Sequence, residues 1–197
     1  MKHKFKLINK SKLDSPKRRE ALPVQRILHT VGVEPSEVVA DIGCGIGYFT
    51  FALSEAVGNE GLVYALDIEP EMLEDIKSKI AESDIKNVIP VITKEYELTL
   101  EDSSIGTALL CTVMHEVKMR EKFLKETNRI LRTDGKIIII EWIKKDSDYG
   151  PPADHRLDKH ILKRNLLRTG FKEIEIMDFN EYFYIVSARK NKKLPVR

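Results

Sequence analysis

Two hydrophobic patterns alternate along this chain of 197 residues. Near-continuous apolar runs such as VVADI (38–42) and KIIIIEW (136–142) are typical of strands that are covered on both faces of a sheet. The segments between such runs carry apolar residues three or four positions apart, which is typical of amphipathic helices. The pattern predicts strands at 37–43, 61–68, 87–93, 105–113 and 135–142, and helices at 48–57, 70–82, 120–131 and 157–170. This alternation predicts a doubly wound, mostly parallel α/β sheet.

The last two predicted strands differ from the others in how they are connected. Residues 171–179 and 181–189 are joined only around Asn180 and Glu181, which is too little chain for a parallel crossover. We therefore expect them to form an antiparallel hairpin that closes a sheet of seven strands.

A leading helix is predicted over residues 16–31. Ser15 is a suitable N-cap, Pro16 occupies the first helical position, and Gly32 ends the pattern. Pro23 is expected to bend the helix. We expect one domain, with an N-terminal arm and helix in residues 1–36, a Rossmann-like core in residues 37–190 and a basic tail in residues 191–197.

Composition narrows the class of protein. A hydrophobic share of 42% and a charged share of 32% fit a soluble globular protein, and no apolar run reaches the ~20 residues of a membrane span. The basic start has no signal-peptide pattern. Cys44 and Cys111 lie at the ends of predicted strands, so we expect two small buried thiols in a cytoplasmic protein without a metal site.

The net charge of +2 is unevenly distributed. The segment from Lys2 to Arg19 is strongly basic, whereas the middle of the chain carries many acids. A basic arm is either a solvated tail or a surface that attracts anions such as RNA.

The sequence VVADIGCGIGYFT suggests where a ligand binds. Gly43, Gly45 and Gly47 follow a predicted strand that ends at Asp41, so the bare backbone can approach a ligand closely. The spacing is G-x-G-x-G, whereas a dinucleotide fingerprint has its third glycine where this chain has Tyr48. A carboxylate at the strand tip repels phosphates and attracts an ammonium group. These features favour a ligand with both charges, as in an amino acid.

Asp67 is a second acid at the end of a predicted strand. Asp67 ends the next predicted strand, where an acid can accept hydrogen bonds from ribose hydroxyls, although it could instead cap the following helix. An amino-acid end combined with a ribose is S-adenosylmethionine.

The stretches VVADIGCGIGYFTFAL, VYALDIEPEML and ILRTDGKIIIIEW resemble the class I S-adenosylmethionine-dependent methyltransferases, particularly the type 11 branch. The resemblance covers residues 38–190 in register. It implies that the glycine loop holds the methionine part of the cofactor, that Asp67 holds the ribose, and that Ile68 and Met72 wall the adenine. The implied cofactor-binding residues are Asp41, Gly43, Gly45, Gly47, Tyr48, Asp67, Ile68, Met72, Glu95, Tyr96 and Thr112.

Two positions depart from the family pattern. Lys94 stands where many relatives have Asp, so Glu95 is the nearest candidate to read the adenine amino group. Gly106 stands where similar proteins often begin the fourth strand with Asp. This second departure suggests a changed structural contact.

The loop after the fourth predicted strand carries the candidate catalytic residues His115 and Glu116. His115 has an ordinary pKa near ~6.5, which suits a general base. The alternative is that His115 packs beside the cofactor or bonds the backbone, and that Glu116 caps the next helix. Trp142, beside Glu141 at the end of the fifth strand, either lines the acceptor pocket or belongs to the core.

A Pro-rich loop over residues 147–158 either folds over the acceptor or is simply a stiff turn. Tyr149, His155 and Arg156 are the residues it would bring to the pocket. Loops at this edge of α/β sheets usually carry specificity.

The sequence therefore predicts methyl transfer from S-adenosylmethionine to a small-molecule acceptor by direct displacement. No N-P-P-Y segment follows the fourth strand, and Cys111 lies in an apolar run, which argues against base-amine and cytosine-C5 chemistry. The alternatives are an RNA or protein methyltransferase that uses the basic arm, or a protein that binds the cofactor without turnover.

Overall fold

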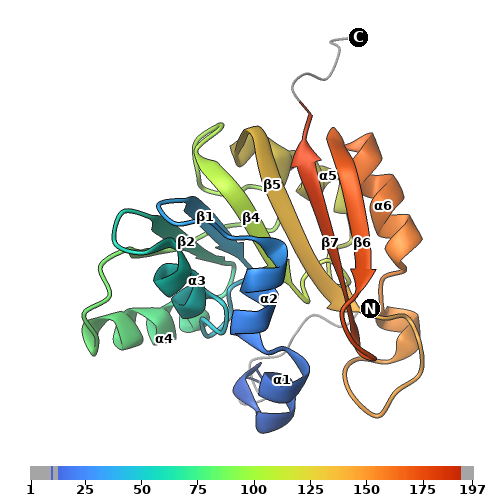
Figure 1. The fold of residues 1–197 in the computed structure, drawn as a ribbon, viewed down its shortest axis with the longest axis horizontal. Helices are drawn as coiled ribbons and strands as arrows, with labels where there is room; N and C mark the ends of the chain where they lie inside the picture. Colours follow the sequence, from blue (N-terminus) through green and yellow to red (C-terminus); the bar gives the residue numbers. More distant parts are fainter. Residues whose placement is uncertain (1–9, 11–12, 192–197) are drawn as a thin grey trace.

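Seven strands form one sheet in the order β3-β2-β1-β4-β5-β7-β6 in the computed structural model, which describes residue 10 and residues 13–191 (Figure 1). Each adjacent pair among β1 to β5 is parallel. The strands are β1 (Val38–Ile42), β2 (Leu62–Asp67), β3 (Val88–Ile92), β4 (Ile105–Cys111), β5 (Leu131–Trp142), β6 (Phe171–Asp178) and β7 (Phe183–Lys190). The predicted mostly parallel seven-stranded sheet is confirmed.

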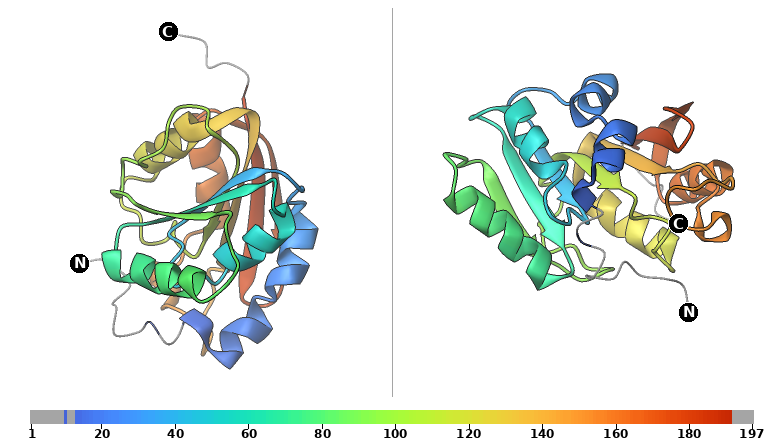
Figure 2. Two further views of the ribbon diagram at one scale, coloured as in Figure 1. Left: turned by 90° about the vertical axis from the view of Figure 1, so that its left-hand side faces the viewer. Right: turned by 90° about the horizontal axis from the view of Figure 1, so that it is seen from below.

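Helices cover both faces of this sheet (Figure 2). Apolar side chains of α2, α3 and α4 pack into the core on one face, and those of α5 and α6 into the core on the other. The helices are α1 (Pro16–Ala21), α2 (Val24–Val31), α3 (Thr50–Val57), α4 (Pro70–Ala81), α5 (Arg120–Ile130) and α6 (Lys159–Arg168), with a short 3₁₀ helix η2 (Ala153–His155). Two covered faces explain why the strands are so apolar.

The last two strands form the predicted antiparallel hairpin, and β7 lies between β5 and β6. The side chain of Asn180 shapes the turn, because its Oδ1 accepts hydrogen bonds of 2.9 Å from the amides of Tyr182 and Phe183. The sequence predicted the hairpin but not the insertion of β7 beside β5.

The predicted leading helix is two helices. Ser15 caps α1, since its Oγ accepts from the amide of Arg18, and Pro16 occupies the first position. The chain breaks at Leu22 and Pro23, and α2 then runs to a left-handed Gly32 with a φ of 63°. The expected bend at Pro23 is thus a full break, because Pro lacks an amide proton and disfavours a helical conformation in the residue before it.

The fifth strand begins earlier than predicted. It starts at Leu131, directly after α5, where the sequence pattern placed the end of a helix and a turn. Leu131 pairs with Ile105, and the register shifts before Thr107 pairs with Lys136. An irregular strand of this kind has no clean period in its sequence, so the pattern located only its apolar second half.

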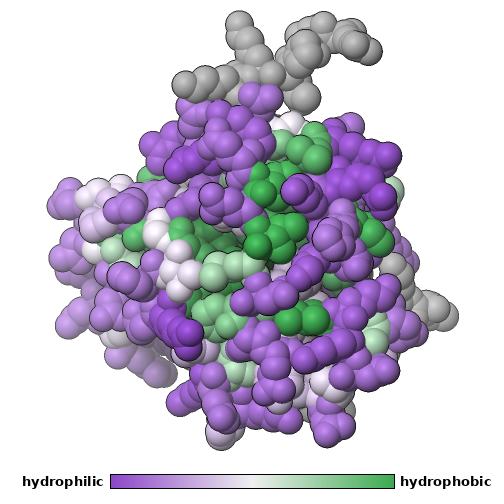
Figure 3. Space-filling view, turned by 45° about the vertical axis from the view of Figure 1, so that its right-hand side comes forward, coloured by the Kyte–Doolittle hydropathy of each residue, from purple (hydrophilic) through white to green (hydrophobic). Residues whose placement is uncertain are grey.

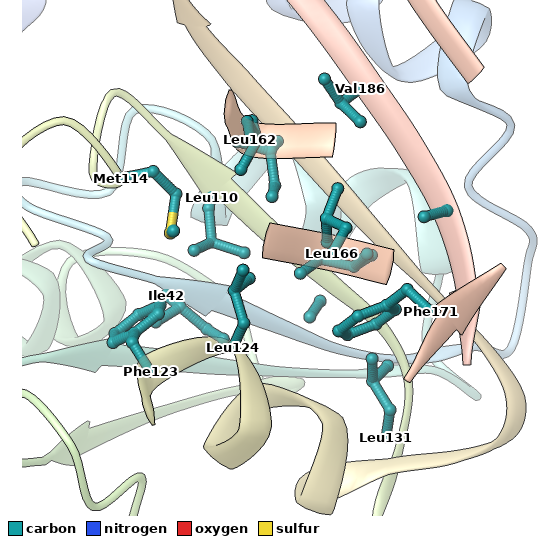
Figure 4. Packing of buried hydrophobic residues seen from close by; sticks show 14 of the residues in the cluster. Ile42, Leu110, Met114, Phe123, Leu124, Leu131, Leu162, Leu166, Phe171 and Val186 are labelled. Carbon is teal, nitrogen blue, oxygen red and sulfur yellow. The ribbon is translucent and has the colours of Figure 1, made fainter. Parts of the chain in front are cut away.

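Apolar side chains of α5 and α6 fill the core against the sheet (Figure 4). Phe123, Leu124, Leu162 and Leu166 are buried in one cluster with Leu110 of β4. Burying each such side chain stabilises the fold by about 1.5–3 kcal/mol. This packing fixes β4 and β5, whose carboxyl ends carry the candidate catalytic residues.

The surface in Figure 3 is mostly polar, with apolar patches between charged residues. The exposed large apolar side chains include Ile161 and Leu167 of α6 and Met177 of β6. Within residue 10 and residues 13–191, no helix has the length and apolar character needed to cross a membrane.

Candidate cofactor and active site

The candidate site lies where the strand order reverses, between β1 and β4. Asp41 belongs to the carboxyl end of β1 and pairs with Leu109 of β4, two residues before Cys111. Figure 1 shows α1 at the end of the sheet to which the arrowhead of β5 points. Ligands of open α/β sheets bind at this edge, so the glycine loop lies in the position that the sequence predicted.

The glycine loop has a backbone that other residues would not tolerate. Gly43 and Gly47 have φ angles of 72° and 85°, in the left-handed region. A Cβ at Gly43 would lie 2.6 Å from the side chain of Val113, and one at Gly47 would lie 2.6 Å from the ring of Phe51. The missing side chains therefore allow the loop to pack against the segment after β4 and against α3.

The amides of the glycine loop are engaged within the protein. The N–H groups of Gly43 and Cys44 donate to the carbonyl of Leu66, and that of Gly47 donates to the carbonyl of Cys44. The N–H of Gly45 donates to Asp67 Oδ2 at 2.8 Å. These four amides are therefore not available to an anionic ligand group.

Asp41 is buried at the tip of β1, with 2% of its surface exposed. The hydroxyl of Thr50 donates a hydrogen bond of 2.6 Å to its carboxylate. Burial raises the pKa of Asp41 to about 7, and the hydrogen bond from Thr50 opposes this rise only in part. A cationic ligand group beside Asp41 would favour its charged form.

Asp67 joins the second strand to the glycine loop. Its Oδ2 accepts from Gly45, and its Oδ1 accepts from the amide of Glu69 at 3.0 Å. Burial raises the pKa of Asp67 although these backbone amides stabilise the carboxylate. A carboxylate has about four lone-pair sites, so it can still accept hydrogen bonds from ribose hydroxyls.

The predicted adenine residues are spread along the same edge. Ile68 is partly exposed directly after β2, whereas Met72 is buried on α4. The hydroxyl of Tyr96 donates to Glu95 Oε1 at 2.5 Å and accepts from the amide of Met119 at 3.3 Å. Tyr96 thus ties the segment after β3 to the segment before α5, and the adenine contacts of these residues stay predictions.

The two departures from the family pattern have structural consequences. Lys94 is exposed and forms an ion pair of 2.9 Å with Glu97. A Cβ at Gly106 would lie 2.9 Å from the guanidinium of Arg132 and 3.0 Å from the carboxylate of Glu37. Glu37, which directly precedes β1, accepts a hydrogen bond from Thr107 of β4. Its carboxylate therefore lies beside the start of β4, where the family pattern has an Asp.

His115 and Glu141 form a buried pair at the carboxyl ends of β4 and β5. The His115 Nδ1 lies 2.9 Å from Glu141 Oε2 and 3.1 Å from Oε1, and Glu141 is completely buried. Burial of the ring lowers the pKa of His115, but the charge and hydrogen bond of Glu141 outweigh it and raise the pKa above its ordinary value. Glu141 also accepts from the amides of His115 and Trp142, which fixes its carboxylate.

Thr112 and Glu116 lie near the His115–Glu141 pair. Thr112 has a φ of 58°, which is rare for a β-branched residue, and its amide donates to Ile140. Glu116 lies 3.8 Å from the Nε2 of His115. The N-cap of α5 is Met119, which makes no side-chain capping bond, so the alternative that Glu116 caps this helix is wrong.

The loop after β5 is held by Trp142 and Arg156. Trp142 is buried, and its ring centre lies 4.2 Å from that of Phe183 and 5.0 Å from that of Tyr149. Arg156 donates five hydrogen bonds to the loop, to the carbonyls of Pro151, Ile143, Lys145 and Tyr149 and to the hydroxyl of Ser147. Arg156 is 3% exposed and therefore supports the loop from inside.

The N-terminal helix contributes a residue that the sequence analysis did not single out. Arg18 is buried, its guanidinium lies 5.3 Å from the ring centre of Tyr48, and its Nη2 lies 3.7 Å from the thiol of Cys111. The hydroxyl of Tyr48 donates to the carbonyl of Leu22 at 2.8 Å. One basic residue in a basic segment carries no local signal that it points inward.

The described part of the basic arm is largely paired. Lys10 forms an ion pair with Asp75, and Arg19 forms one with Asp14 at 2.7 Å. Lys17 lies 4.9 Å from the ring centre of Tyr149. The rest of the predicted arm, residues 2–9 and 11–12, lies outside the described residues.

Other features do not compete for the site. A cavity of about 850 Å³ lies at the opposite edge of the sheet and is lined by Gly106, Arg132 and Lys136, without any residue of the glycine loop. In the described part of the chain, no three His, Cys, Asp or Glu side chains are placed to hold a metal ion. Burial raises the pKa of the Cys111 thiol to about 12, so this thiol is inert near neutral pH.

Known proteins resemble this chain in sequence. The family model described as a methyltransferase domain of type 11 matches residues 40–139, about half of the chain. The arsenite methyltransferase of Halobacterium salinarum is 27% identical over 78% of this chain and 42% of its own length. The demethylmenaquinone methyltransferase of Staphylococcus aureus is 34% identical over 59% of this chain and 48% of its own. The chain spans less than half the length of both curated relatives.

A solved structure matches over nearly the whole length of both chains. The SAM-dependent methyltransferase from Aquifex aeolicus superposes with a TM-score of 0.90 and 28% identity, covering 94% of this chain and 99% of that one. Its fold agrees with the seven-stranded sheet and the covering helices described above. The chain therefore belongs to the class I S-adenosylmethionine-dependent methyltransferases, in the type 11 branch.

Proposed function

We propose that this protein transfers a methyl group from S-adenosylmethionine to a small-molecule acceptor by direct displacement, with His115 as the general base. The observation that supports this role is the buried contact of 2.9 Å between the His115 ring and Glu141. We propose further that the whole chain forms one methyltransferase domain.

The residues at the switch point fit the cofactor. Asp41 supplies a buried carboxylate for an ammonium group, and Asp67 keeps acceptor capacity for ribose hydroxyls. Arg18 supplies a buried cation on the same side of the sheet. When bound, S-adenosylmethionine supplies a methyl group on a sulfonium that any well-placed nucleophile can attack.

The Glu141–His115 pair prepares the acceptor for attack. The carboxylate of Glu141 accepts the Nδ1–H of His115, which leaves the Nε2 lone pair as the proton acceptor. Nε2 takes the proton from the acceptor atom that attacks the methyl group, which makes this acceptor atom nucleophilic. Because Glu141 stabilises the resulting imidazolium, it acts as a positioning residue for His115.

A small acceptor is favoured over RNA or protein. Three described basic residues of the N-terminal arm, Lys10, Arg19 and Lys17, pair with Asp75, Asp14 and the Tyr149 ring. The relatives named above carry the names of methyltransferases that act on arsenite and demethylmenaquinone. Demethylmenaquinone is the first acceptor to assay. Arsenite is the second, because arsenic methylation in similar proteins uses several cysteines and this chain has two, both buried.

The test measures S-adenosylhomocysteine formed from S-adenosylmethionine and each acceptor, by the wild type and three variants. His115→Gln should lower the rate about 10²- to 10⁴-fold, and Glu141→Gln should lower it less and shift the rise of activity to lower pH. His160→Gln, on the exposed side of α6, should match the wild type. Equal rates for His115→Gln and the wild type would remove His115 from the mechanism.

Cofactor binding is tested separately by calorimetry with S-adenosylhomocysteine and NAD. Heat with NAD and none with S-adenosylhomocysteine would contradict the proposal as a whole. Binding of S-adenosylhomocysteine without methylation of any acceptor in a broad screen would support the alternative of a binding protein. Steep weakening of RNA binding by salt, together with methylated RNA as a product, would support the RNA alternative.

A further inference from the structure

Arg18 is a buried cation with an unused donor. Its side chain belongs to a residue that is 7% exposed, and its Nε has no hydrogen-bond partner among the described residues. Its Nη2 has only a contact of 3.7 Å with the thiol of Cys111, and thiols are weak acceptors. A buried donor without a partner destabilises the folded protein, so its presence calls for a ligand that completes it.

The position of Arg18 is at the carboxyl edge between β1 and β4. Cys111 ends β4, and Tyr48, whose ring lies under the guanidinium, follows the last glycine of the loop. The charge of Arg18 acts against the burial that raises the pKa of Asp41 and of Tyr149. Its field therefore reaches β1, β4, the glycine loop and the loop after β5.

Four amides of the glycine loop offer no free donor to an anion at this position. The amides of Gly43, Cys44, Gly45 and Gly47 are bonded within the protein. Asp41 and Asp67 carry the same sign of charge as an anionic ligand. Arg18 is a buried cation at this edge with an unpartnered Nε, and guanidinium binds carboxylates through two parallel hydrogen bonds.

We propose that Arg18 binds a carboxylate, or a similar planar oxyanion, of the ligand held between β1 and β4, through its Nε–H and Nη2–H edge. The inference rests on the proposed function, because it assumes that the methyl-transfer site lies there. The carboxylate belongs either to the amino-acid end of the cofactor or to an acidic acceptor.

The first experiment measures affinities by calorimetry for S-adenosylhomocysteine and for 5′-methylthioadenosine, which lacks the amino-acid end. Arg18→Met should weaken binding of S-adenosylhomocysteine about 10- to 100-fold and leave that of 5′-methylthioadenosine within about twofold, if the cofactor supplies the carboxylate. Arg18→Lys should recover part of the loss. Arg19→Met is the matched control, because Arg19 is exposed and paired with Asp14, and it should bind both compounds like the wild type.

The second experiment titrates benzoate and benzamide into protein saturated with S-adenosylhomocysteine. If an acidic acceptor supplies the carboxylate, Arg18→Met should keep its affinity for S-adenosylhomocysteine and bind benzoate about 10- to 100-fold more weakly than the wild type does. Benzamide should bind both proteins weakly and equally. Urea unfolding of each variant confirms that the protein is folded.

Wild-type and Arg18→Met affinities that agree within twofold for S-adenosylhomocysteine, with no difference in benzoate binding, overturn the inference. In that outcome, binding of S-adenosylhomocysteine by the wild type still supports the proposed function. Failure of the wild type to bind S-adenosylhomocysteine overturns the proposed function itself.

Discussion

Two buried arginines lie at the same end of the sheet and differ in their partners. Arg156 is 3% exposed and donates five hydrogen bonds, four of them to backbone carbonyls. Arg18 is 7% exposed, yet its Nε has no partner and its Nη2 contacts only a thiol. Both lie over an aromatic ring, Arg156 over Trp142 and Arg18 over Tyr48.

Burial alone therefore does not indicate the role of a charged residue. Burying a charge is costly unless hydrogen bonds replace those it made with water. Arg156 meets this requirement within the protein and stabilises the loop after β5, whereas Arg18 meets it only when a ligand is bound. Hydrogen-bond satisfaction therefore separates a structural cation from a binding one.

The largest expected effect contrasts these two residues directly. Arg156→Met should lower the free energy of unfolding by about 3 kcal/mol or more, because four carbonyls and a hydroxyl lose their donor. Arg18→Met should stay within about 1 kcal/mol of the wild type, since it removes a donor that has no partner. Urea unfolding without ligand measures both values, and equal losses for the two variants would erase the distinction.

A buried acid with a partner extends the comparison to Glu141. Glu141→Gln should lower the free energy of unfolding by about 1–3 kcal/mol at pH 6, because charged His115 loses its counterion. His115 has a raised pKa in the folded protein, so its contribution is fully present below its ordinary pKa and is lost as the pH rises through the raised value. The destabilisation should therefore be smaller at pH 9 than at pH 6.

The measurement for Glu141 combines urea unfolding at several pH values with an NMR titration of His115. The pKa of His115 should fall in Glu141→Gln. A His115 pKa that does not change would show that the contact of 2.9 Å carries no charge interaction.

A smaller effect is expected for Tyr48, whose ring lies beside the guanidinium of Arg18. Tyr48→Phe removes the hydrogen bond of 2.8 Å from the Tyr48 hydroxyl to the carbonyl of Leu22, and should cost about 1 kcal/mol in urea unfolding. Tyr64→Phe on β2 is the control, because the Tyr64 hydroxyl has no hydrogen-bond partner within the described residues. A loss in the control as large as that in Tyr48→Phe would mean that the bond to Leu22 contributes nothing.

The smallest effect is a shift in pH dependence at Asp41. Because burial raises its folded pKa from 3.8 to about 7, the native protein binds the extra proton and loses stability as the pH rises through this interval. Arg18 favours the charged carboxylate, so Arg18→Met should raise the Asp41 pKa further and extend the loss to higher pH. Asp41→Asn should remove this part of the pH dependence.

The comparison of unfolding free energies from pH 4 to pH 9 checks this shift in the protein without ligand. The contribution of Asp41 is the difference between each protein and the same protein with Asp41→Asn. In the Arg18→Met background, this difference should reach its plateau at higher pH than in the wild-type background. Plateaus at the same pH would show that Arg18 does not act on Asp41.

Much of the fold was predictable because it depends on local pattern. The apolar runs predicted β1 to β4 to within a few residues, and the short link at Asn180 predicted an antiparallel pair. Leu131 was misassigned, because the irregular first half of β5 has no period. The leading helix was predicted as one piece, because the sequence did not show whether Pro23 bends a helix or ends it.

The candidate site was predictable in part for the same reason. Asp41 and Asp67 lie at the carboxyl ends of β1 and β2, and the three glycines come within five residues after β1. Their place at the carboxyl edge therefore follows from the sequence pattern. The roles proposed for Arg156 and Arg18 were not predictable, because each depends on which groups surround a side chain and not on its neighbours in sequence.

Local sequence encodes the alternation of strands and helices, the bare glycine loop and the acids at two strand tips, because each of these features spans a few adjacent residues. The pairing of His115 with Glu141, 26 residues apart, and the contact of Arg18 with Cys111, 93 residues apart, depend on the folded chain. The physical reason is that strand order and packing bring these groups together, and that the hydrogen bonds of a buried charge are completed by whatever the fold places beside it.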